Sequence, residues 1–178
     1  MVSVLRSSLV FAELLRLRAR PQDLPARDGV VVGSVLAVFG ASMLAVHEIY
    51  TPGRAVGRVL VDVLLEAGFV LGVLRVTGRP ERFRQTFSAL CGTGAILVLL
   101  TWPLVDIVVQ RPPGSALAGI ALLLLLAIYG WSALVIGHIL RYALDLSLGR
   151  AVLLALAYVL VSSLLGDALV PPPMGMTP

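Results

Sequence analysis

The sequence of 178 residues has no lysine and a single cysteine, Cys91. Only 13% of its residues are charged, against about one-quarter in soluble domains. At the same time 58% are hydrophobic and the mean hydropathy is +0.98. A soluble chain of this length could not hide so much Leu, Val and Ala in one core, so the composition is typical of a membrane protein. The use of arginine alone as the basic residue is typical of a high-GC genome and indicates a bacterium.

Several chemistries have no motif here. One cysteine cannot form an internal disulfide, and Cys91 lies in an apolar run, where we expect a small packing residue. The stretch "HEIY" at 47–50 begins like a zinc-protease motif, but Thr51 stands where the second histidine belongs. There is no GxSxG motif and no phosphate loop. We therefore predict no enzyme, no cofactor, no metal site and no nucleic-acid binding.

Five long apolar segments remain, separated by stretches with proline or glycine. They predict an all-α polytopic membrane protein, a bundle of five transmembrane helices preceded by an N-terminal interfacial helix. The predicted spans are about 29–50, 55–75, 86–109, 116–140 and 151–170.

The regions flanking the predicted bundle are short. Residues 1–27 form a cytoplasmic region, in which the amphipathic stretch 2–18 is too short and too charged to span and is predicted to lie on the membrane surface. A link with two prolines follows. Residues 28–170 form the membrane domain, with Asp28 expected as the N-cap of its first helix, and residues 171–178 form an extended tail.

The distribution of arginine predicts the orientation. Alternate segments between the spans hold eleven arginines on one side and three on the other. The arginine-rich side is cytoplasmic by the positive-inside rule. We therefore expect a bacterial inner-membrane protein with its N-terminus in the cytoplasm and its C-terminus in the periplasm.

The second span carries a regular stripe of charge. Arg54, Arg58, Asp62 and Glu66 are four residues apart and therefore lie on one helix face. Arg58 and Asp62 are predicted to pair. The acids offset the apolar residues around them, so this helix should insert only with the help of its neighbours. Glu66 lies near the midplane with Val70 one turn further in, and a carboxyl group without a basic partner there should be protonated at neutral pH.

Four further polar residues fall in the outer halves of the spans: His47, Glu48, Asp106 and Asp167. Together with Asp62 they suggest an acid-lined outer funnel closed below by Glu66. Three interpretations are open. The charges hold the bundle together as ion pairs and helix-end groups, or they line a cavity for protons, cations or a basic ligand, or they form a surface for a protein partner.

Small residues recur in the spans. Gly29 and Gly33 form one GxxxG pair and Gly68 and Gly72 another, and we expect them to serve contacts inside the bundle more than dimerisation. The glycines of "CGTGA" at 91–95 are also interpreted as packing residues.

Two segments resemble a known family. They are "RFRQTFSALCGTGAILVLLTWP", before and within the third span, and "WSALVIGHILRYALDLSLGRAVLLALAYVLV", which joins the last two. In a chain with an interfacial segment and five spans, they resemble a bacterial member of the Yip (Ypt-interacting protein) superfamily, over roughly residues 28–170. The "DLYGP"-like motif of eukaryotic members is absent, and no functional residue is carried over.

The resemblance implies a structural or adaptor component that organises the membrane without catalysis. Its expected partners are membrane lipids and other membrane proteins or a second copy of the chain. The alternative is a small transporter or channel component that uses Glu66 and Asp62 as proton or cation sites.

Overall fold

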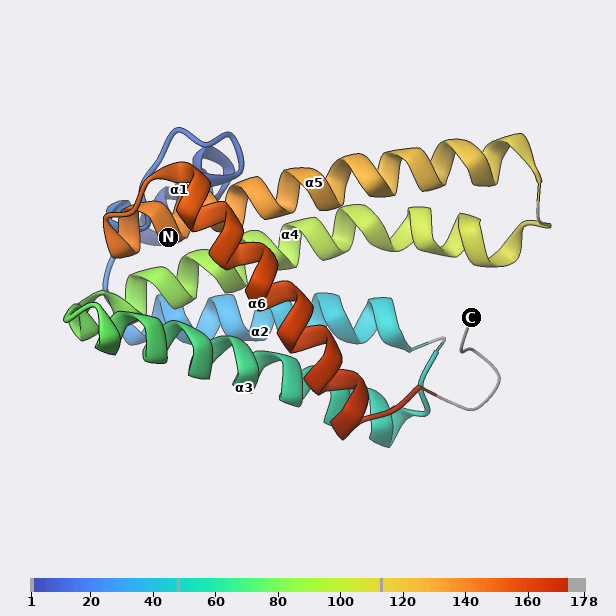
Figure 1. The fold of residues 1–178 in the computed structure, drawn as a ribbon, viewed down its shortest axis with the longest axis horizontal. Coiled ribbons are helices and arrows are strands. Elements are labelled where there is room, and N and C mark those ends of the chain that lie inside the picture. The colour runs from blue at the N-terminus through green and yellow to red at the C-terminus, as the bar shows by residue number, and fades with distance from the viewer. Residues whose placement is uncertain (1, 48, 113, 173–178) are drawn as a thin grey trace.

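All regular structure in the described part of the chain is helical (Figure 1). The structure is a computed structural model and describes residues 2–47, 49–112 and 114–172. Figure 1 shows α2 to α5 running lengthwise, with α6 crossing them diagonally. The helices are α1 Val2–Leu15, α2 Asp28–Val46, α3 Pro52–Val76, α4 Phe83–Gln110, α5 Ala116–Leu144 and α6 Leu148–Leu169.

Four of these helical segments are long and apolar enough to cross a membrane. They are Asp28–Val46, Pro80–Gln110, Ala116–Leu144 and Leu148–Leu169, which contain α2, α4, α5 and α6. They coincide with four of the five predicted spans, so the all-α class and these four helices are confirmed. The remaining predicted span is α3, which has 25 residues and is long enough, but its charges keep it outside this apolar set.

The breaks between helices have local causes in the sequence. Gly78, after α3, has a φ of 71°, a left-handed conformation that glycine adopts without strain. Ser115 caps α5, because its hydroxyl accepts a hydrogen bond of 3.1 Å from the Ala118 amide. Asp145 ends the same helix in a left-handed conformation with a φ of 53°.

The start of α2 differs from the sequence prediction. Arg27 precedes the helix and Asp28 is its first residue, so the expectation that Asp28 is the N-cap is wrong. The Asp28 carboxylate instead lies 3.2 Å from Nη2 of Arg84 near the start of α4. This ion pair places the first turns of α2 and α4 at the same level.

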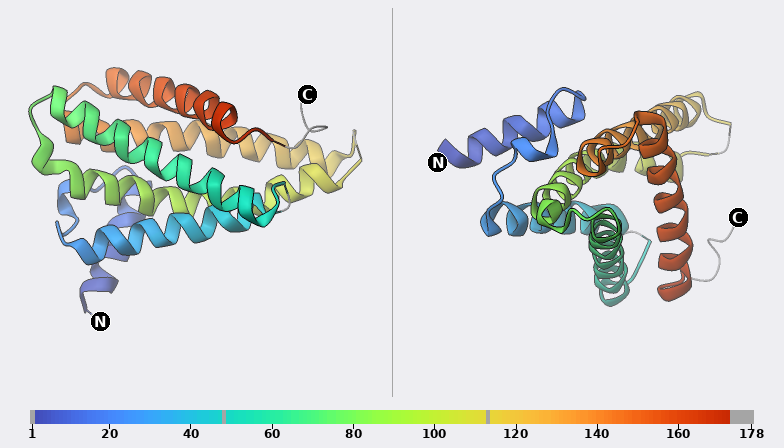
Figure 2. Two further views of the ribbon diagram at one scale, coloured as in Figure 1. Left: turned by 90° about the horizontal axis from the view of Figure 1, so that it is seen from below. Right: turned by 60° about the vertical axis from the view of Figure 1, so that its left-hand side comes forward.

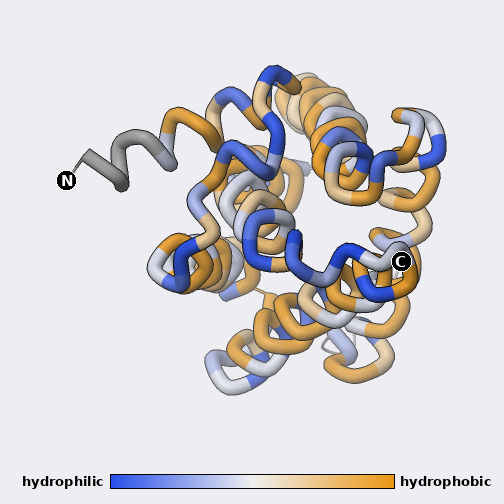
Figure 3. Tube along the Cα trace, turned by 90° about the vertical axis from the view of Figure 1, so that its left-hand side faces the viewer, coloured by the Kyte–Doolittle hydropathy of each residue, from blue (hydrophilic) through white to orange (hydrophobic). Residues whose placement is uncertain are grey.

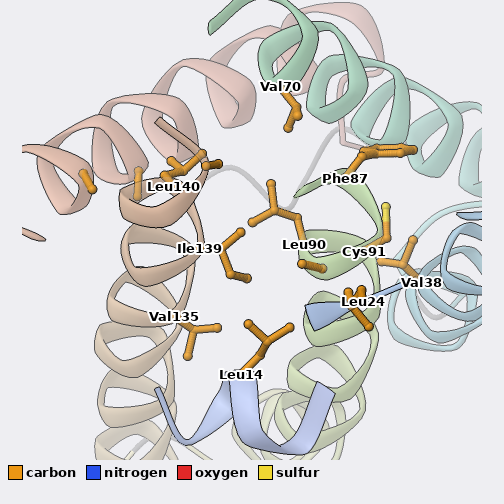
Figure 4. Close-up of a cluster of buried hydrophobic side chains, with 14 of the residues drawn as sticks. Leu14, Leu24, Val38, Val70, Phe87, Leu90, Cys91, Val135, Ile139 and Leu140 are labelled. Carbon is orange, nitrogen blue, oxygen red and sulfur yellow. The ribbon is translucent and has the colours of Figure 1, made fainter. Parts of the chain in front are cut away.

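The core lies toward the end of the bundle where α2 begins and α5 ends. There α4 packs between α2 and α5, α6 packs on α5, and α3 contacts both α2 and α6. Figure 4 shows side chains from several of these helices meeting in one cluster. Its most deeply buried members include Leu14, Leu24, Val70, Leu74, Cys91, Val135, Ile139 and Leu140.

Much of the outer surface is apolar. Leu123 of α5 and Leu153 of α6 are both 68% exposed, and Leu164 is 63% exposed. Many other large hydrophobic side chains on α2, α5 and α6 are exposed as well. Soluble monomers rarely expose so large a continuous apolar area, whereas lipid-facing helices require one.

α5 and α6 cross closely at small residues. A Cβ added to Gly137 would lie 2.5 Å from Cγ2 of Val152 and 3.0 Å from its Cα. Ala151 and Ala155 of α6 are fully buried at the same crossing. Small side chains therefore set the approach of these two helices.

The glycines of "CGTGA" also serve packing, as the sequence predicts. A Cβ at Gly92 would lie 2.3 Å from Cε1 of Phe11, so the ring from α1 occupies the space that a side chain would need. At Gly94 the nearest atom would be Cγ2 of Val38, at an ordinary contact distance of 3.7 Å.

Unlike Gly92 and Gly137, the glycines of the two GxxxG pairs make no close helix contact. A Cβ at Gly29, Gly33, Gly68 or Gly72 would meet no atom within 4 Å outside its own helix. The expectation that these pairs form close contacts within the bundle is therefore wrong for the described residues. Both pairs instead lie beside open grooves.

α1 lies outside the bundle and runs across it rather than along it (Figure 2). Leu14 anchors its last turn and is fully buried. Trp131 of α5 donates a hydrogen bond of 3.1 Å from Nε1 to the Leu15 carbonyl oxygen. Seven residues further along α5, His138 donates from Nε2 to the carbonyl oxygen of Ala19, over 2.9 Å.

Candidate functional site

Three charged residues of the predicted set come together where α3 meets α6. Nε of Arg58 lies 3.1 Å from Oδ2 of Asp62, so the predicted pair one turn apart is confirmed. Nη1 of the same arginine donates to Oδ1 of Asp167, near the end of α6. The Arg58 side chain is only 15% exposed, whereas those of Asp62 and Asp167 are 46% and 55% exposed.

A glycine makes room for this cluster. A Cβ at Gly166, the residue before Asp167, would lie 2.8 Å from the guanidinium carbon of Arg58. The planar guanidinium group therefore lies directly over the backbone of α6. The arginine joins two helices that are far apart in sequence, and its charge is shared between two carboxylates.

Glu66, the last member of the stripe, has a different neighbour. Its Oε2 lies 3.7 Å from Sγ of Cys91, which is fully buried in α4. Among the described residues no arginine or histidine forms an ion pair with it. Nearby, α3 and α6 also meet through two aromatic rings: Phe69 of α3 stacks on Tyr158 of α6, with ring centroids 4.3 Å apart. Glu66 therefore faces the interior through a thiol and without a positive charge.

The residues proposed for an outer funnel do not all meet. Asp167 and Asp62 share Arg58. Asp106 of α4 instead accepts a hydrogen bond from Gln110 on its own helix. No ion pair joins Asp106 to an arginine in the described part of the chain.

Of the two remaining funnel residues, His47 directly follows the end of α2. The ring of His47 meets Trp102 edge-on, with centroids 6.4 Å apart, and thus links α2 to α4. Glu48 lies outside the described residues. The described funnel residues therefore do not form one cluster: Asp62 and Asp167 meet at Arg58 between α3 and α6, and His47 makes a separate contact between α2 and α4.

Cavities lie elsewhere. Two of about 410 and 380 Å³ lie between α3 and α6 and share Gly68, Phe69 and Leu154 in their walls. A larger one of about 860 Å³ lies between α1, α2 and α4. Neither Asp62 nor Glu66 lines any of these three cavities.

A polar cluster that the sequence interpretation missed holds the opposite end of the bundle together. Figure 3 looks onto this end and shows hydrophilic segments in its loops. Arg82 donates from Nη1 to the carbonyl oxygens of Tyr142 and Ala143, each over 3.0 Å. Asp145 lies 2.8 Å from Nη2 of Arg79. The loop after α3 is thereby fixed to the end of α5.

Two glutamines extend this cluster to the link after α1. Gln85 donates from Nε2 to the carbonyl oxygens of Gln22 and Leu24, over 3.1 and 2.9 Å. Gln22 in turn donates to the carbonyl oxygen of Tyr142 over 2.9 Å. Sequence alone gives little sign of these contacts, because an uncharged glutamine near a helix end is common and its backbone partner is distant in the chain.

Within residues 2–47, 49–112 and 114–172, no three His, Cys, Asp or Glu side chains are placed to hold a metal ion. The contacts at both ends are ion pairs and side-chain bonds to backbone carbonyls. Chemically, the arrangement can join helices and neutralise charge.

Comparison with models of protein families, with curated proteins and with solved structures finds no match to this chain.

Proposed function

We propose that this chain is a small inner-membrane protein that acts as a structural or adaptor component without catalysis. The observation that carries the proposal is the Arg58 cluster. Its positive charge is taken up by Asp62 and Asp167, which are both within the same protein. Ion pairs that join two helices stabilise a bundle, and the Arg58 guanidinium occupies the position between the two carboxylates that a bound cation would take.

The same cluster supports a fifth membrane crossing by α3. At 25 residues and 1.5 Å per residue, α3 is about 37 Å long, enough for the hydrocarbon core of about 30 Å. Arg58 pairs with Asp167 of α6 and with Asp62 on α3 itself, and Glu66 contacts Cys91 of α4, so none of the three is left without a partner. A charged helix can remain in lipid when its charges are satisfied by protein.

The proposed orientation has the N-terminus in the cytoplasm and the C-terminus in the periplasm. Arginines gather at the end where α3 ends, α4 begins and α5 ends, among them Arg79, Arg82 and Arg84. The positive-inside rule assigns this end to the cytoplasm. Because the five helices alternate in direction, the end of α6 then faces the periplasm.

α1 fits an interfacial position in the inner leaflet. Phe11 lies on Gly92, nine residues into α4 and thus about 13 Å along its axis. We place the start of α4 at the outer edge of the headgroup layer, which is about 5–8 Å thick. Subtracting this thickness from the depth of Gly92 leaves α1 about 5–8 Å below the boundary of the hydrocarbon core. Interfacial helices typically lie about 5–10 Å into that boundary.

Membership of the Yip superfamily remains part of this proposal. It is supported by the resemblance of the third span and the last two spans, and by the order of one crosswise helix followed by α2 to α6. The adaptor role that it implies needs a surface for partners. Gly68 and Gly72 lie open beside the α3–α6 groove, and small residues of this kind allow another helix to approach closely.

A transporter or channel component is the second candidate, because Glu66 has no basic partner in the described residues and contacts Cys91. A carboxyl group in this position could take up and release a proton. It would need a hydrated path, and the three described cavities do not reach it.

Photo-crosslinking in living cells tests the adaptor role. A photoreactive amino acid at Leu64, on the α3–α6 groove, should form adducts with another membrane protein or with a second copy of the chain. Leu123 on α5 is the matched control, because both leucines are 68% exposed. Adducts at Leu64 but not at Leu123 support the proposal, and protein adducts at neither position refute it.

A further inference from the structure

The largest of the three cavities is a groove that follows most of α2 from its arginine-rich end. It lies between α1, α2 and α4, with a volume of about 860 Å³, within the usual range for small-molecule sites. Its walls are mainly apolar along α2 and α4, from Val30 to Leu44 and from Gly92 to Leu99. Polar residues lie at Arg27 and on α1, where Ser7 and Ser8 line the groove.

Arg27 gives this groove a positive mouth. Its side chain forms no ion pair within the described residues, and the residue is exposed. The adjacent acid, Asp28, is already paired with Arg84 at 3.2 Å. The positive charge at the mouth is therefore uncompensated by the protein, and an anion is the ligand that would complete it.

The groove follows nearly the whole of α2 and is about as long as one extended phospholipid, which occupies half the thickness of a bilayer. From Arg27 to Leu44 is 17 residues, or about 25 Å along α2 at 1.5 Å per residue. Half of a bilayer with its headgroups is about 20–23 Å thick. α1 crosses this length about halfway, where Phe11 lies on Gly92, so part of the groove runs beneath a helix.

We propose that this groove binds one anionic phospholipid of the inner leaflet, with its phosphate at Arg27 and an acyl chain along α2 beneath α1. Basic pockets between membrane helices on the cytoplasmic side are suited to lipid headgroups. The apolar walls of the groove would contact the acyl chain in the way that neighbouring lipid tails do in the bilayer. The proposal depends on the membrane setting of the protein, and it is independent of the adaptor role.

Two substitutions separate the headgroup contact from the acyl-chain contact. Arg27→Gln removes the charge at the mouth, and its matched control is Arg75→Gln, an exposed cytoplasmic-side arginine outside the groove. Gly33→Leu places a side chain in the groove, because a Cβ there meets nothing within 4 Å. Its control is Gly130→Leu on α5, where a Cβ also meets nothing within 4 Å and which does not line the groove.

The experiment is a lipid titration of delipidated protein in detergent, followed by native mass spectrometry, with phosphatidylglycerol and phosphatidylcholine as probes. We expect one phosphatidylglycerol per chain, bound more tightly than phosphatidylcholine. Arg27→Gln should weaken its binding about fivefold, the usual effect of one arginine near an anionic headgroup. Gly33→Leu should weaken it about tenfold by displacing about two methylene groups of the chain.

Both controls should bind as the wild type does, and melting curves without lipid should show that all four variants are folded. Equal binding of both lipids, or equal binding by all variants, overturns the proposal. Glycerol phosphate, which carries the phosphate group but no acyl chains, is tested as a competitor of phosphatidylglycerol. If it displaces phosphatidylglycerol completely at similar concentration, the groove contributes nothing and the proposal is also wrong.

Discussion

Arg58 of α3 donates a hydrogen bond to Asp167 of α6, 109 residues further along the chain, while it also pairs with Asp62 one turn away. The guanidinium group lies over Gly166, where a Cβ would come within 2.8 Å of it. One side chain thus pairs with two acids and joins the most charged helix to the last helix. A helix with this many charges is favoured in a bundle when its charged groups find partners on a neighbouring helix.

Replacing this arginine should destabilise the protein moderately. Arg58→Gln leaves both carboxylates without their cation, but Asp62 and Asp167 are 46% and 55% exposed and partly solvated. We expect the free energy of unfolding to fall by about 1–2 kcal/mol, less than the 3–5 kcal/mol typical of a fully buried pair. Equilibrium unfolding in detergent micelles measures this change.

A double-mutant cycle tests whether the arginine acts through Asp167. Arg58→Gln combined with Asp167→Asn should cost less than the two single changes added together, by about 0.5–1 kcal/mol. Asp106→Asn is the control, because that acid forms no ion pair in the described residues, and it should add independently. Additive behaviour of Arg58 and Asp167 would show that their contact does not contribute to stability.

The crossing of α5 and α6 should be intolerant of side chains at Gly137. A Cβ there would lie 3.0 Å from the Cα of Val152, and a backbone atom cannot move away as easily as a side-chain end. Gly137→Ala should lower the free energy of unfolding by about 1–3 kcal/mol.

Gly130→Ala on the same helix is the matched control for that prediction, because its Cβ would meet nothing within 4 Å. It should change stability little or increase it, since alanine favours the helix. Thermal melting of both variants in the same detergent provides the comparison. Equal effects at the two positions would be incompatible with a close crossing at Gly137.

Gly92 should control whether α1 stays docked. A Cβ at Gly92 would lie 2.3 Å from the Phe11 ring, whereas one at Gly94 would be at an ordinary 3.7 Å from Val38. Gly92→Ala should therefore displace α1 and leave the rest of the bundle folded, while Gly94→Ala should leave α1 in place. Trypsin cleavage after Arg16 and the arginines that follow it should become faster only in Gly92→Ala.

Helix positions could be predicted well from the sequence because their boundaries depend on nearby residues. The span at 116–140 corresponds to α5, which Ser115 caps and Asp145 ends, and the span at 55–75 corresponds to α3, which ends just before the turn at Gly78. The pair Arg58–Asp62 was predictable for the same reason, because four residues on a helix fix the distance.

Contacts between distant residues could not be predicted in this way. Asp167 was expected in the outer polar region, but its partner Arg58 follows from how α6 crosses α3. Gly68 and Gly72 satisfy a pattern for close packing and yet lie beside a groove, because the pattern does not specify which helix occupies that face. The side chain–backbone contacts of Gln22 and Gln85 depend on tertiary arrangement alone.

Labelling of single cysteines tests the five crossings and the orientation. Cys91 is fully buried, so Cys91→Ser provides the background. Thr51→Cys and Gln110→Cys should react with a membrane-impermeant maleimide from the periplasm, and Glu81→Cys only after the inner face is opened. These positions flank α3 and α4 and are exposed.

The loop pair around α3 is the decisive one, since this helix is the least apolar. Labelling of Thr51→Cys and Glu81→Cys from the same side would show that α3 does not cross. Labelling of Glu81→Cys alone from the periplasm would show that the orientation is reversed.

Ion flux through the purified protein is the most direct test of a structural role against transport. Glu66 contacts Cys91 and has no basic partner in the described residues, so it is the one acid of α3 that could still serve as a proton or cation site. Wild-type protein and Glu66→Gln are reconstituted in liposomes, proton and cation flux is recorded against empty liposomes, and thermal stability is measured in parallel. For a structural or adaptor protein we predict no flux above empty liposomes from either version, with similar stability. Flux through the wild type that is lost in an equally stable Glu66→Gln would contradict that role and establish transport instead.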